Sequence, residues 1–386
     1  MTSEETGRDR RELLRRAEAA FRAGRLAEAE NCFRQVLAAS PEQADALHFL
    51  GLLAHHRGEN EVALPLIRRS IEIWPDWPVF HQNLGGIFLA LERPAEAAAC
   101  FARALELEPE SFLTLGSLVM AHDALGDRAC ARNFGQRCLE AKDRAACAGR
   151  QGKALPAGLR APGFRADRPA ENVIAFSLFG DNEYYARYAV ENAIGRRFVY
   201  PEWTCRFYVD TAVPEPVVAR LVREGAQVVR MGVRASGNEG LFWRFLAAND
   251  PGVRYFLCRD CDSVLNLRER LAVEEWLESG FPFHLMRDHV VHTELILAGM
   301  WGGVGGLLPD VMAELPAFLR GYAGRWADQA WLRQRVWPLI RAVALTHDSN
   351  YRIGETRDFP RLGRLPGGAH VGGAMPGKGP QAEFRA

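Results

Sequence analysis

The first 145 residues repeat one arrangement of small, apolar and turn-forming positions every 34 residues. The repeated positions hold alanine (Ala29, Ala63, Ala97, Ala131), proline (Pro41, Pro75, Pro109) and glycine (Gly24, Gly58, Gly126, with Glu92 in the remaining glycine slot). Glycine ends a helix, proline begins or punctuates the next one, and a small alanine lets two helices approach closely. The period therefore predicts helix–turn–helix units, which stack because one unit cannot bury its apolar face alone.

Two further features keep this period: leucine–glycine pairs and a large apolar slot (Leu50-Gly51, Leu84-Gly85; Phe33, Ile67, Phe101). At these residues the chain resembles the tetratricopeptide repeat family over residues 10–143. Three repeats are regular, and in a degenerate fourth Asp143 replaces the proline and Gly135 the large apolar residue. The resemblance implies an all-α solenoid whose surface binds a peptide, an acceptor or another protein. A module for packing or self-association, without a ligand, is the alternative interpretation.

Residues 144–171 keep no period and are rich in glycine, proline and alanine. We interpret them as a solvated hinge between domains. Their excess of arginine would also suit a basic lip over a phosphate-bearing substrate. At the other end of the chain, we expect residues 376–386 to form a flexible tail.

From Asn172 onward, short apolar runs alternate with helical patterns. The runs predict strands at 173–178, 204–209, 226–231 and 253–258, with helical segments between them, including 216–223 and 241–248. This alternation favours a largely parallel sheet covered on both faces. Ligands bind such sheets at the carboxyl ends of the strands. Candidate functional residues should therefore follow the strands directly.

Two carboxylates follow the fourth expected strand. Extended backbone would place Asp260 and Asp262 on the same side, while Cys261 turns back into the core. Paired carboxylates suit a hard cation such as Mn²⁺ or Mg²⁺, which would bridge the phosphates of a nucleotide. A solvated turn in which Arg259 forms a salt bridge is the alternative.

Three other segments accompany this pair: Gly180-Asp181-Asn182-Glu183-Tyr184 after the first strand, Arg244 on the helix before the fourth, and Asp328-Gln329 after an Ala-Gly-Met segment. With them, residues 172–375 resemble glycosyltransferases of the GT-A type, of the glycogenin and lipopolysaccharide galactosyltransferase kind. The resemblance implies an α/β nucleotide-diphospho-sugar transferase fold. It also implies a donor site and a catalytic pair that holds the sugar (Phe179, Gly180, Asp181, Asn182, Tyr184, Arg244, Arg259, Asp260, Gly299; Asp328, Gln329).

A late histidine completes the metal site in that family. Here His370 lies in a loose version of the family's segment, and His347 competes for the role beside Asp260 and Asp262. Imidazole is an acceptable ligand for Mn²⁺.

Each candidate also has a structural interpretation. Arg244 would pair with Asp250 or cap a helix, and Asp328 would lie on a helix surface. Tyr184 would be a packing aromatic, and either histidine a core or surface residue.

Charge and composition narrow the function classes. Lys plus Arg equals Asp plus Glu at 48 each, which argues against nucleic-acid binding. We recognise no secretory signal and no apolar stretch long enough to span a membrane, so we expect a soluble, cytoplasmic protein. The eight cysteines are scattered, and the lone pair Cys258 and Cys261 lacks the second ligand pair that a zinc site would need.

We therefore expect a metal-dependent glycosyltransferase that moves a sugar from a nucleotide-sugar donor to a glycan, peptide or other acceptor. The family resemblance favours UDP as the nucleotide of the donor. By the same resemblance, the transfer would retain the anomeric configuration. The alternative from another class is a repeat scaffold with an inactive transferase domain. A sugar nucleotidyltransferase would need a glycine-rich, arginine-containing loop where Phe179-Gly180-Asp181-Asn182 stands. A GT-B catalytic part would need two Rossmann-like halves, more than about 200 residues supply.

Overall fold

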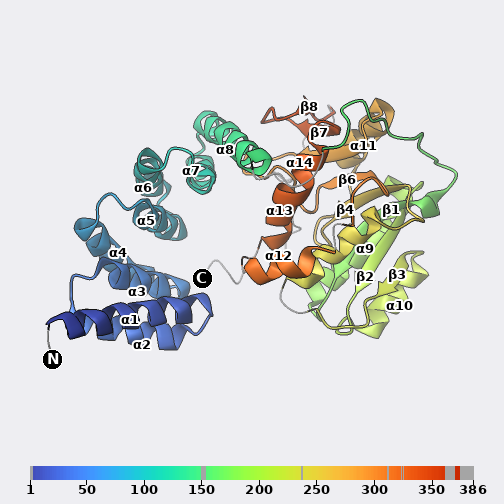
Figure 1. Ribbon diagram of the computed structural model, residues 1–386. Helices are drawn as coiled ribbons and strands as arrows, with labels where there is room; N and C mark the ends of the chain where they lie inside the picture. The colour runs from blue at the N-terminus through green and yellow to red at the C-terminus, as the bar shows by residue number, and fades with distance from the viewer. Residues whose placement is uncertain are drawn as a thin grey trace. The chain divides into compact units, whose positions relative to one another are not determined.

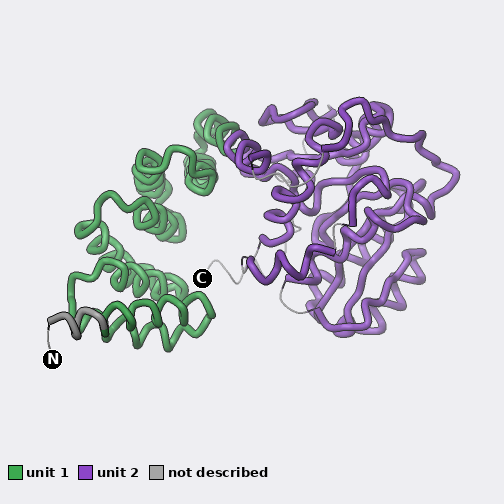
Figure 2. The backbone as a smooth tube through the Cα atoms, in the orientation of Figure 1, with its two compact units in different colours: residues 1–138, 383–386 green, residues 139–382 purple. Residues whose placement is uncertain are grey.

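The computed structural model describes residues 3–148, 154–235, 238–310, 313–322, 324, 326–360 and 370–373. The chain divides into two compact units, residues 1–138 and 139–382 (Figures 1 and 2). The expected tail, residues 376–386, lies outside the described residues.

Unit 1 consists of helices, and α8 continues from it into unit 2 (Figure 1). The helices are α1 (Ser3–Arg22), α2 (Leu26–Ala39), α3 (Ala44–His56), α4 (Asn60–Ile73), α5 (Pro78–Ala90), α6 (Pro94–Leu107), α7 (Phe112–Ala124) and α8 (Arg128–Ala148). Helices α1 and α2, α3 and α4, and α5 and α6 pack as pairs. The four period-forming alanines are fully buried, as are Phe33 and Ile67, and Phe101 is nearly so. The expected helix–turn–helix units are confirmed.

The glycine slots of the repeat share one backbone conformation. Gly24, Gly58 and Gly126 have φ of 71°, 78° and 75°, and Glu92 takes φ 56° in the same slot. The slot therefore keeps its left-handed geometry where the glycine is replaced. Such a conformation costs a residue with a Cβ atom about 1–2 kcal/mol.

The segment interpreted as a hinge contacts unit 2 where it is described. The N–H of Leu155 donates to the carbonyl of Leu339, and the N–H of Ala161 to that of Gly280, both at 2.9 Å. The carbonyl of Gly163 accepts from the guanidinium of Arg254. Residues 155–163 belong to unit 2 and are hydrogen-bonded to its α/β part. The hinge between domains stays a prediction.

Unit 2 is built on an eight-stranded sheet of order β3-β2-β1-β4-β6-β5-β7-β8 (Figure 1). The strands are β1 (Asn172–Leu178), β2 (Thr204–Val209), β3 (Gln227–Arg230), β4 (Tyr255–Arg259), β5 (Phe283–Arg287), β6 (Trp301–Val304), β7 (Ala344–Asp348) and β8 (Glu355–Arg357). Only β6, among the described strands, runs antiparallel to its neighbours. The four expected strands are β1 to β4, so the α/β alternation is confirmed.

Helices and short turns connect these strands: η1 (Pro169–Glu171), α9 (Glu183–Val199), α10 (Glu215–Arg223), η2 (Glu239–Ala248), α11 (Leu267–Ser279), α12 (Leu315–Gly321), α13 (Ala327–Trp331), η3 (Leu332–Val336) and α14 (Trp337–Ile340). The expected helix at 241–248 is the 3₁₀ helix η2. Buried residues of β1, β2 and β4 share one core with α9, α10 and α11. On the other side of β4, Phe256 contacts Trp301, and Phe245 of η2 stacks on Trp331 of α13. Successive residues of β4 therefore face different layers.

None of the eight cysteines, each in the described part of the chain, forms a disulfide. Cys258 and Cys261 are buried, and their sulfur atoms contact the carbonyls of Arg244 and Ser177. Within the described ranges, no helix combines the length and apolar character needed to cross a bilayer.

Candidate active site

The two aspartates lie in a tight turn that follows β4. The N–H of Ser263 donates to the carbonyl of Asp260 at 3.2 Å. Asn192 of α9, fully buried, holds this turn: its Nδ2 donates to the carbonyls of Cys261 and Ser263, and its Oδ1 accepts from the N–H of Leu265. The turn is therefore anchored by a side chain from a different element, and Cys261 points into the core as expected.

Arg244 joins two of the expected acidic residues. Its Nη1 contacts Oδ1 of Asp260, and its Nη2 donates to Oδ2 of Asp328 at 2.9 Å. Arg244 and Asp328 are buried, whereas Asp260 keeps 45 % of its side chain exposed. Burial opposes the charge of Arg244, but the two carboxylates outweigh it and raise the pKa of its guanidinium. The structure thus brings together Arg244, Asp260 and Asp328. The alternative pairing of Arg244 with Asp250 is not found among the described contacts, in which Asp250 pairs with Arg206.

Within the described part of the chain, no ion pair joins Asp262 to a cation in the way that Arg244 is joined to Asp260. Its burial, together with the charge of Asp260, raises the pKa of its carboxyl to about 6, and the more distant Arg244 only partly opposes this. Burial and the charge of Asp262 likewise raise the pKa of Tyr184. The side chain of Tyr184 is therefore close enough to Asp262 for the charge of that carboxylate to affect it. A carboxylate whose charge is disfavoured in this way gains from a bound cation.

Gly299 lies directly against the first aspartate. A Cβ atom on Gly299 would stand 2.0 Å from Oδ2 of Asp260 and 3.1 Å from its backbone nitrogen. Any side chain at residue 299 would displace the carboxylate of Asp260. Packing therefore requires glycine at this position.

Asp328 and Gln329 lie in the first turn of helix α13 (Ala327–Trp331). Oδ1 of Asp328 accepts from the N–H of Gln329 at 2.8 Å, and burial raises the pKa of the Asp328 carboxyl while Arg244 opposes that rise. Asp328 is buried rather than lying on a helix surface.

The segment after β1 is organised by Asp210, which follows β2. Oδ1 of Asp210 accepts from the N–H groups of Gly180, Ala212 and Val213, and Oδ2 from that of Ala235. Within the segment, Asn182 caps α9 by accepting from the N–H of Tyr184, and Asp181 is exposed.

Phe179 packs against η2 instead of standing free. Its ring lies edge-on to Trp243, and a Cβ atom on Gly240 would meet it at 2.6 Å. This contact connects the end of β1 to the element that carries Arg244.

Arg259 faces away from the acidic pair. Its guanidinium is buried and donates to Oε1 of Glu269 on α11 at 2.6 Å, and Tyr200 donates to the same oxygen. Strand alternation explains the difference from the expected donor contact, because Arg259 points to the α11 layer. In the turn, the arginine that pairs with Asp260 is Arg244, not Arg259.

His347 lies on β7, in the core of the sheet. Its Nε2 contacts Glu275 at 3.0 Å and its Nδ1 contacts His284 at 2.8 Å. Burial lowers the pKa of its imidazole, although Glu275 opposes this. Because β7 is three strand spacings from β4, about 14 Å, this position does not support His347 as a ligand beside the aspartates.

His370 lies with two histidines that follow β5. Its ring centroid is 4.8 Å from that of His289 and 4.6 Å from that of His292. The neighbouring N–H of Val371 donates to Asp288, which also forms an ion pair with Arg268. Among the described contacts, none joins His370 to either aspartate, so its role as a metal ligand stays a prediction.

Several residues that shape this site carry no sequence motif. Asn192 is one polar residue inside a helix, Ser177 accepts from the N–H of Arg244, and Asp210 follows a strand like many aspartates. The approach of His289 and His292 to His370 depends on strand order, which no local pattern records. Only the position of Asp210 at the carboxyl end of a strand was a usable signal.

Comparison with known proteins identifies the helical repeats. Family models described as tetratricopeptide repeat match residues 14–78 and 80–111. Human tetratricopeptide repeat protein 7A is 31 % identical over 88 residues, which cover 23 % of this chain and 10 % of that protein. Together with the observed helix pairs, these matches show that the N-terminal part carries tetratricopeptide repeats.

Solved structures show more distant similarity. An O-GlcNAc transferase from Thermobaculum terrenum is similar with a TM-score of 0.41 and 21 % identity, covering 67 % of this chain and 47 % of that one. MamA is similar with a TM-score of 0.33 and 18 % identity, covering 35 % of this chain and 78 % of that one. Pseudomonas aeruginosa pilF has a TM-score of 0.34 and 19 % identity, covering 37 % and 67 %. The chain thus spans a tenth of the curated relative and about half of the first of these structures.

Proposed function

We propose that unit 2 is a metal-dependent glycosyltransferase that moves a sugar from a nucleotide-sugar donor to an acceptor hydroxyl. The observation that carries the proposal is the acidic turn after β4. There Asp260 is paired with buried Arg244, while no ion pair of Asp262 is found among the described residues. This turn stands at the carboxyl end of a strand in an α/β sheet, where such folds bind ligands.

The residues fit a hard divalent ion. Asp260 and Asp262 supply carboxylate oxygens, the ligand type that Mn²⁺ and Mg²⁺ prefer. Asp262 is partly buried with a pKa of about 6, so a bound cation would remove the unfavourable interaction between the two carboxylates. Such an ion would act as a Lewis acid on the departing diphosphate.

Arg244 has a distinct task in this scheme. Its Nη atoms hold Asp260 and Asp328, and its buried Nε makes no hydrogen bond within the described part of the chain. The guanidinium therefore fixes the two acidic side chains relative to each other and supplies positive charge near the leaving group. Asp328 and Gln329 would hold the hydroxyls of the transferred sugar, as the GT-A resemblance implies.

The donor's nucleotide would lie toward the segment after β1. The charge of Asp262 contributes to the raised pKa of Tyr184. Asn182 caps the helix that carries this tyrosine. We propose UDP as the nucleotide and retention as the stereochemical outcome, both from the family resemblance.

The repeats of unit 1 would bind the acceptor or a protein partner. Tetratricopeptide helices stack into an extended surface, and such surfaces bind peptides or proteins.

A thermal-shift screen of nucleoside diphosphates with and without Mn²⁺ tests the donor site. A ligand that binds only the folded state stabilises it by mass action, by about 2.7 kcal/mol when the free ligand concentration is 100 times Kd. The melting temperature rises accordingly. We expect a Mn²⁺-dependent rise with one nucleotide that disappears in Asp262→Ala. The matched control Asp358→Ala removes an exposed carboxylate of unit 2 and should keep the rise.

Turnover is tested on the nucleotide sugar whose base gives the shift. Release of nucleoside diphosphate, absent in Asp262→Ala, is the expected result, whereas release of pyrophosphate would indicate a nucleotidyltransferase. If no nucleotide shifts the wild type with Mn²⁺ or Mg²⁺, the proposal is wrong. The tetratricopeptide repeats then favour the scaffold function.

A further inference from the structure

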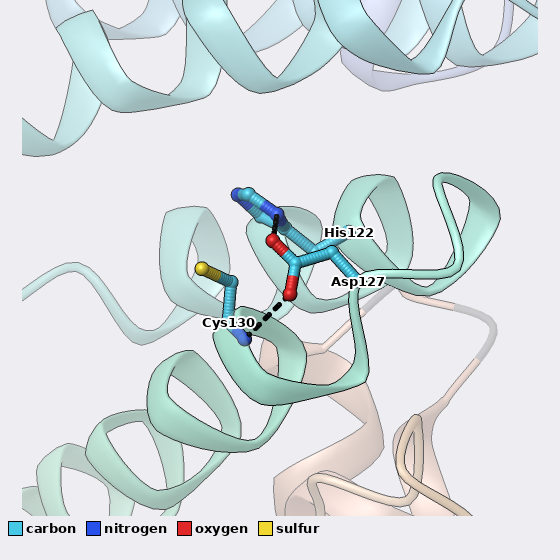
Figure 3. Close-up of side chains that lie close together, drawn as sticks. All are labelled: His122, Asp127 and Cys130. Carbon is cyan, nitrogen blue, oxygen red and sulfur yellow. Dashed lines mark hydrogen bonds and ion pairs between the residues drawn. The ribbon is translucent and has the colours of Figure 1, made fainter.

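Three potential metal ligands meet at the turn between α7 and α8. His122 lies near the end of α7, Asp127 precedes α8 and Cys130 lies in the first turn of α8. One nitrogen, one carboxylate oxygen and one sulfur of these residues all lie within 4.8 Å of one another. Figure 3 shows the three side chains pointing toward a common space on one side of the turn.

The carboxylate of Asp127 has two separate tasks. Its Oδ1 accepts from the N–H of Cys130 at 3.1 Å, which caps the N-terminus of α8. Its Oδ2 lies 3.4 Å from Nδ1 of His122. The helix cap therefore uses one oxygen and leaves the other directed at the imidazole.

Nδ1 of His122 is the second independent observation. This atom is buried, and apart from its contact with Asp127 it has no polar partner within the described ranges, although buried polar atoms normally make a hydrogen bond. The imidazole ring of His122 packs against the ring of Phe134 on α8, with the ring centroids 5.3 Å apart. A nitrogen held in this way, next to a carboxylate and a thiol, has a lone pair available for a metal ion.

We propose that His122, Asp127 and Cys130 form a metal site for Zn²⁺ in the last helix pair of the repeats. Imidazole, carboxylate and thiolate are all zinc ligands, and three of them leave the fourth tetrahedral position to water or to a ligand from a bound partner. The ion would tie the end of α7 to the start of α8.

Proton balance gives the site a defined pH dependence. Cysteine binds a metal ion as the thiolate, so a thiol that still holds its proton must lose it on binding. Binding of the ion replaces that proton, which leaves to solvent as the S–metal bond forms. Affinity for the ion therefore rises with pH.

Cobalt binding to the full chain tests the site, because Co²⁺ occupies zinc sites and a cobalt–thiolate bond absorbs in the near ultraviolet. Oxygen-only sites, such as the Asp260 and Asp262 pair, do not produce this band. We expect one equivalent of Co²⁺ to give the band, Zn²⁺ to abolish it, and Cys130→Ser to lack it. The matched control Cys100→Ser removes a partly buried thiol of α6 and should keep it.

A second variant separates ligation from folding. His122→Gln should weaken cobalt binding at least tenfold while the helical circular dichroism stays unchanged, because loss of a ligand affects the ion more than the fold. A wild-type protein without the thiolate band, or a band that survives in Cys130→Ser, would show that the three residues form only a hydrogen-bonded helix cap.

Discussion

The environment of Asp262 disfavours the charge of its carboxylate. Burial and the neighbouring Asp260 raise the pKa of its carboxyl to about 6 from an ordinary value of 3.8. The folded protein therefore keeps a proton on Asp262 at pH values where the unfolded chain has lost it. The stability that this proton supplies is complete below pH 3.8 and is lost as the pH rises through about 6.

Replacement of Asp262 by asparagine should therefore stabilise the metal-free protein at neutral pH. The amide carries no charge, so the gain should be on the order of 1 kcal/mol, discounted for partial exposure, or about 2–4 °C in melting temperature. The gain should shrink as the pH falls from 7.5 to 4. Melting curves in a chelating buffer measure it, with Asp358→Asn as the exposed control. A wild type that is more stable than Asp262→Asn at pH 7.5 would contradict the assigned environment.

At the scale of single elements, the glycine position of the repeats keeps its backbone conformation even when the residue there is not glycine. Glu92 occupies a glycine slot and still adopts φ 56°. The conformation is therefore imposed by the helix pair and not by the residue. A side chain in this conformation carries a strain that glycine does not.

Glu92→Gly should accordingly stabilise unit 1 by about 0.5–1 kcal/mol, since relief of the left-handed strain exceeds the added freedom of the unfolded chain. Chemical denaturation followed by circular dichroism measures the change. Glu92→Ala keeps the Cβ atom and should show no such gain. Equal gains in both variants would mean that the glutamate side chain, and not the backbone, is the source of strain.

Close helix approach in the repeats depends on Gly85 but not on its neighbour Gly86. A Cβ atom on Gly85 would stand 2.5 Å from the ring of Phe101, whereas nothing lies within 4 Å of one on Gly86. Gly85→Ala should destabilise by about 1–3 kcal/mol through overpacking. Gly86→Ala should stabilise by up to about 1 kcal/mol, because alanine favours helix. The same denaturation measurement compares them, and a stabilising Gly85→Ala would show that the helix pair is looser than described.

The elements also show what sequence reasoning can and cannot predict. Periodicity predicted the helix pairs and β1 to β4, because those patterns are local. Strand β6 was missed: its glycines Gly302 and Gly303 pack against Phe256 and Phe283, and nothing local distinguishes them from a loop. The resemblance singled out Arg244 as a donor-binding residue but not its contact with Asp260. The role of Asn192 depends on a partner about 70 residues away, which no motif could supply.

At the scale of the whole molecule, the boundary between the two compact units falls inside a helix. Unit 2 begins at Leu139, although α8 starts at Arg128. Nζ of buried Lys142 donates to the carbonyl of Thr293 at 2.8 Å and contacts Glu294. Asp143 accepts from Nε1 of Trp337 at 2.8 Å and pairs with Arg341. The last turns of α8 are therefore part of the α/β unit, and the residue at the degenerate proline slot, Asp143, is one of its anchors.

A fragment of residues 127–386 should for this reason be more stable than one of residues 149–386. Loss of Lys142 and Asp143 leaves buried groups of unit 2 without partners, at a cost of about 2–4 kcal/mol. For a unit of this size, the melting temperature should fall by about 5 °C or more. Within the longer fragment, Asp143→Ala should reproduce part of the loss, and Ala145→Ser, at an exposed position of the same helix, should not. If the two fragments melted together, α8 would belong wholly to the repeats, and the α/β unit would begin only after it.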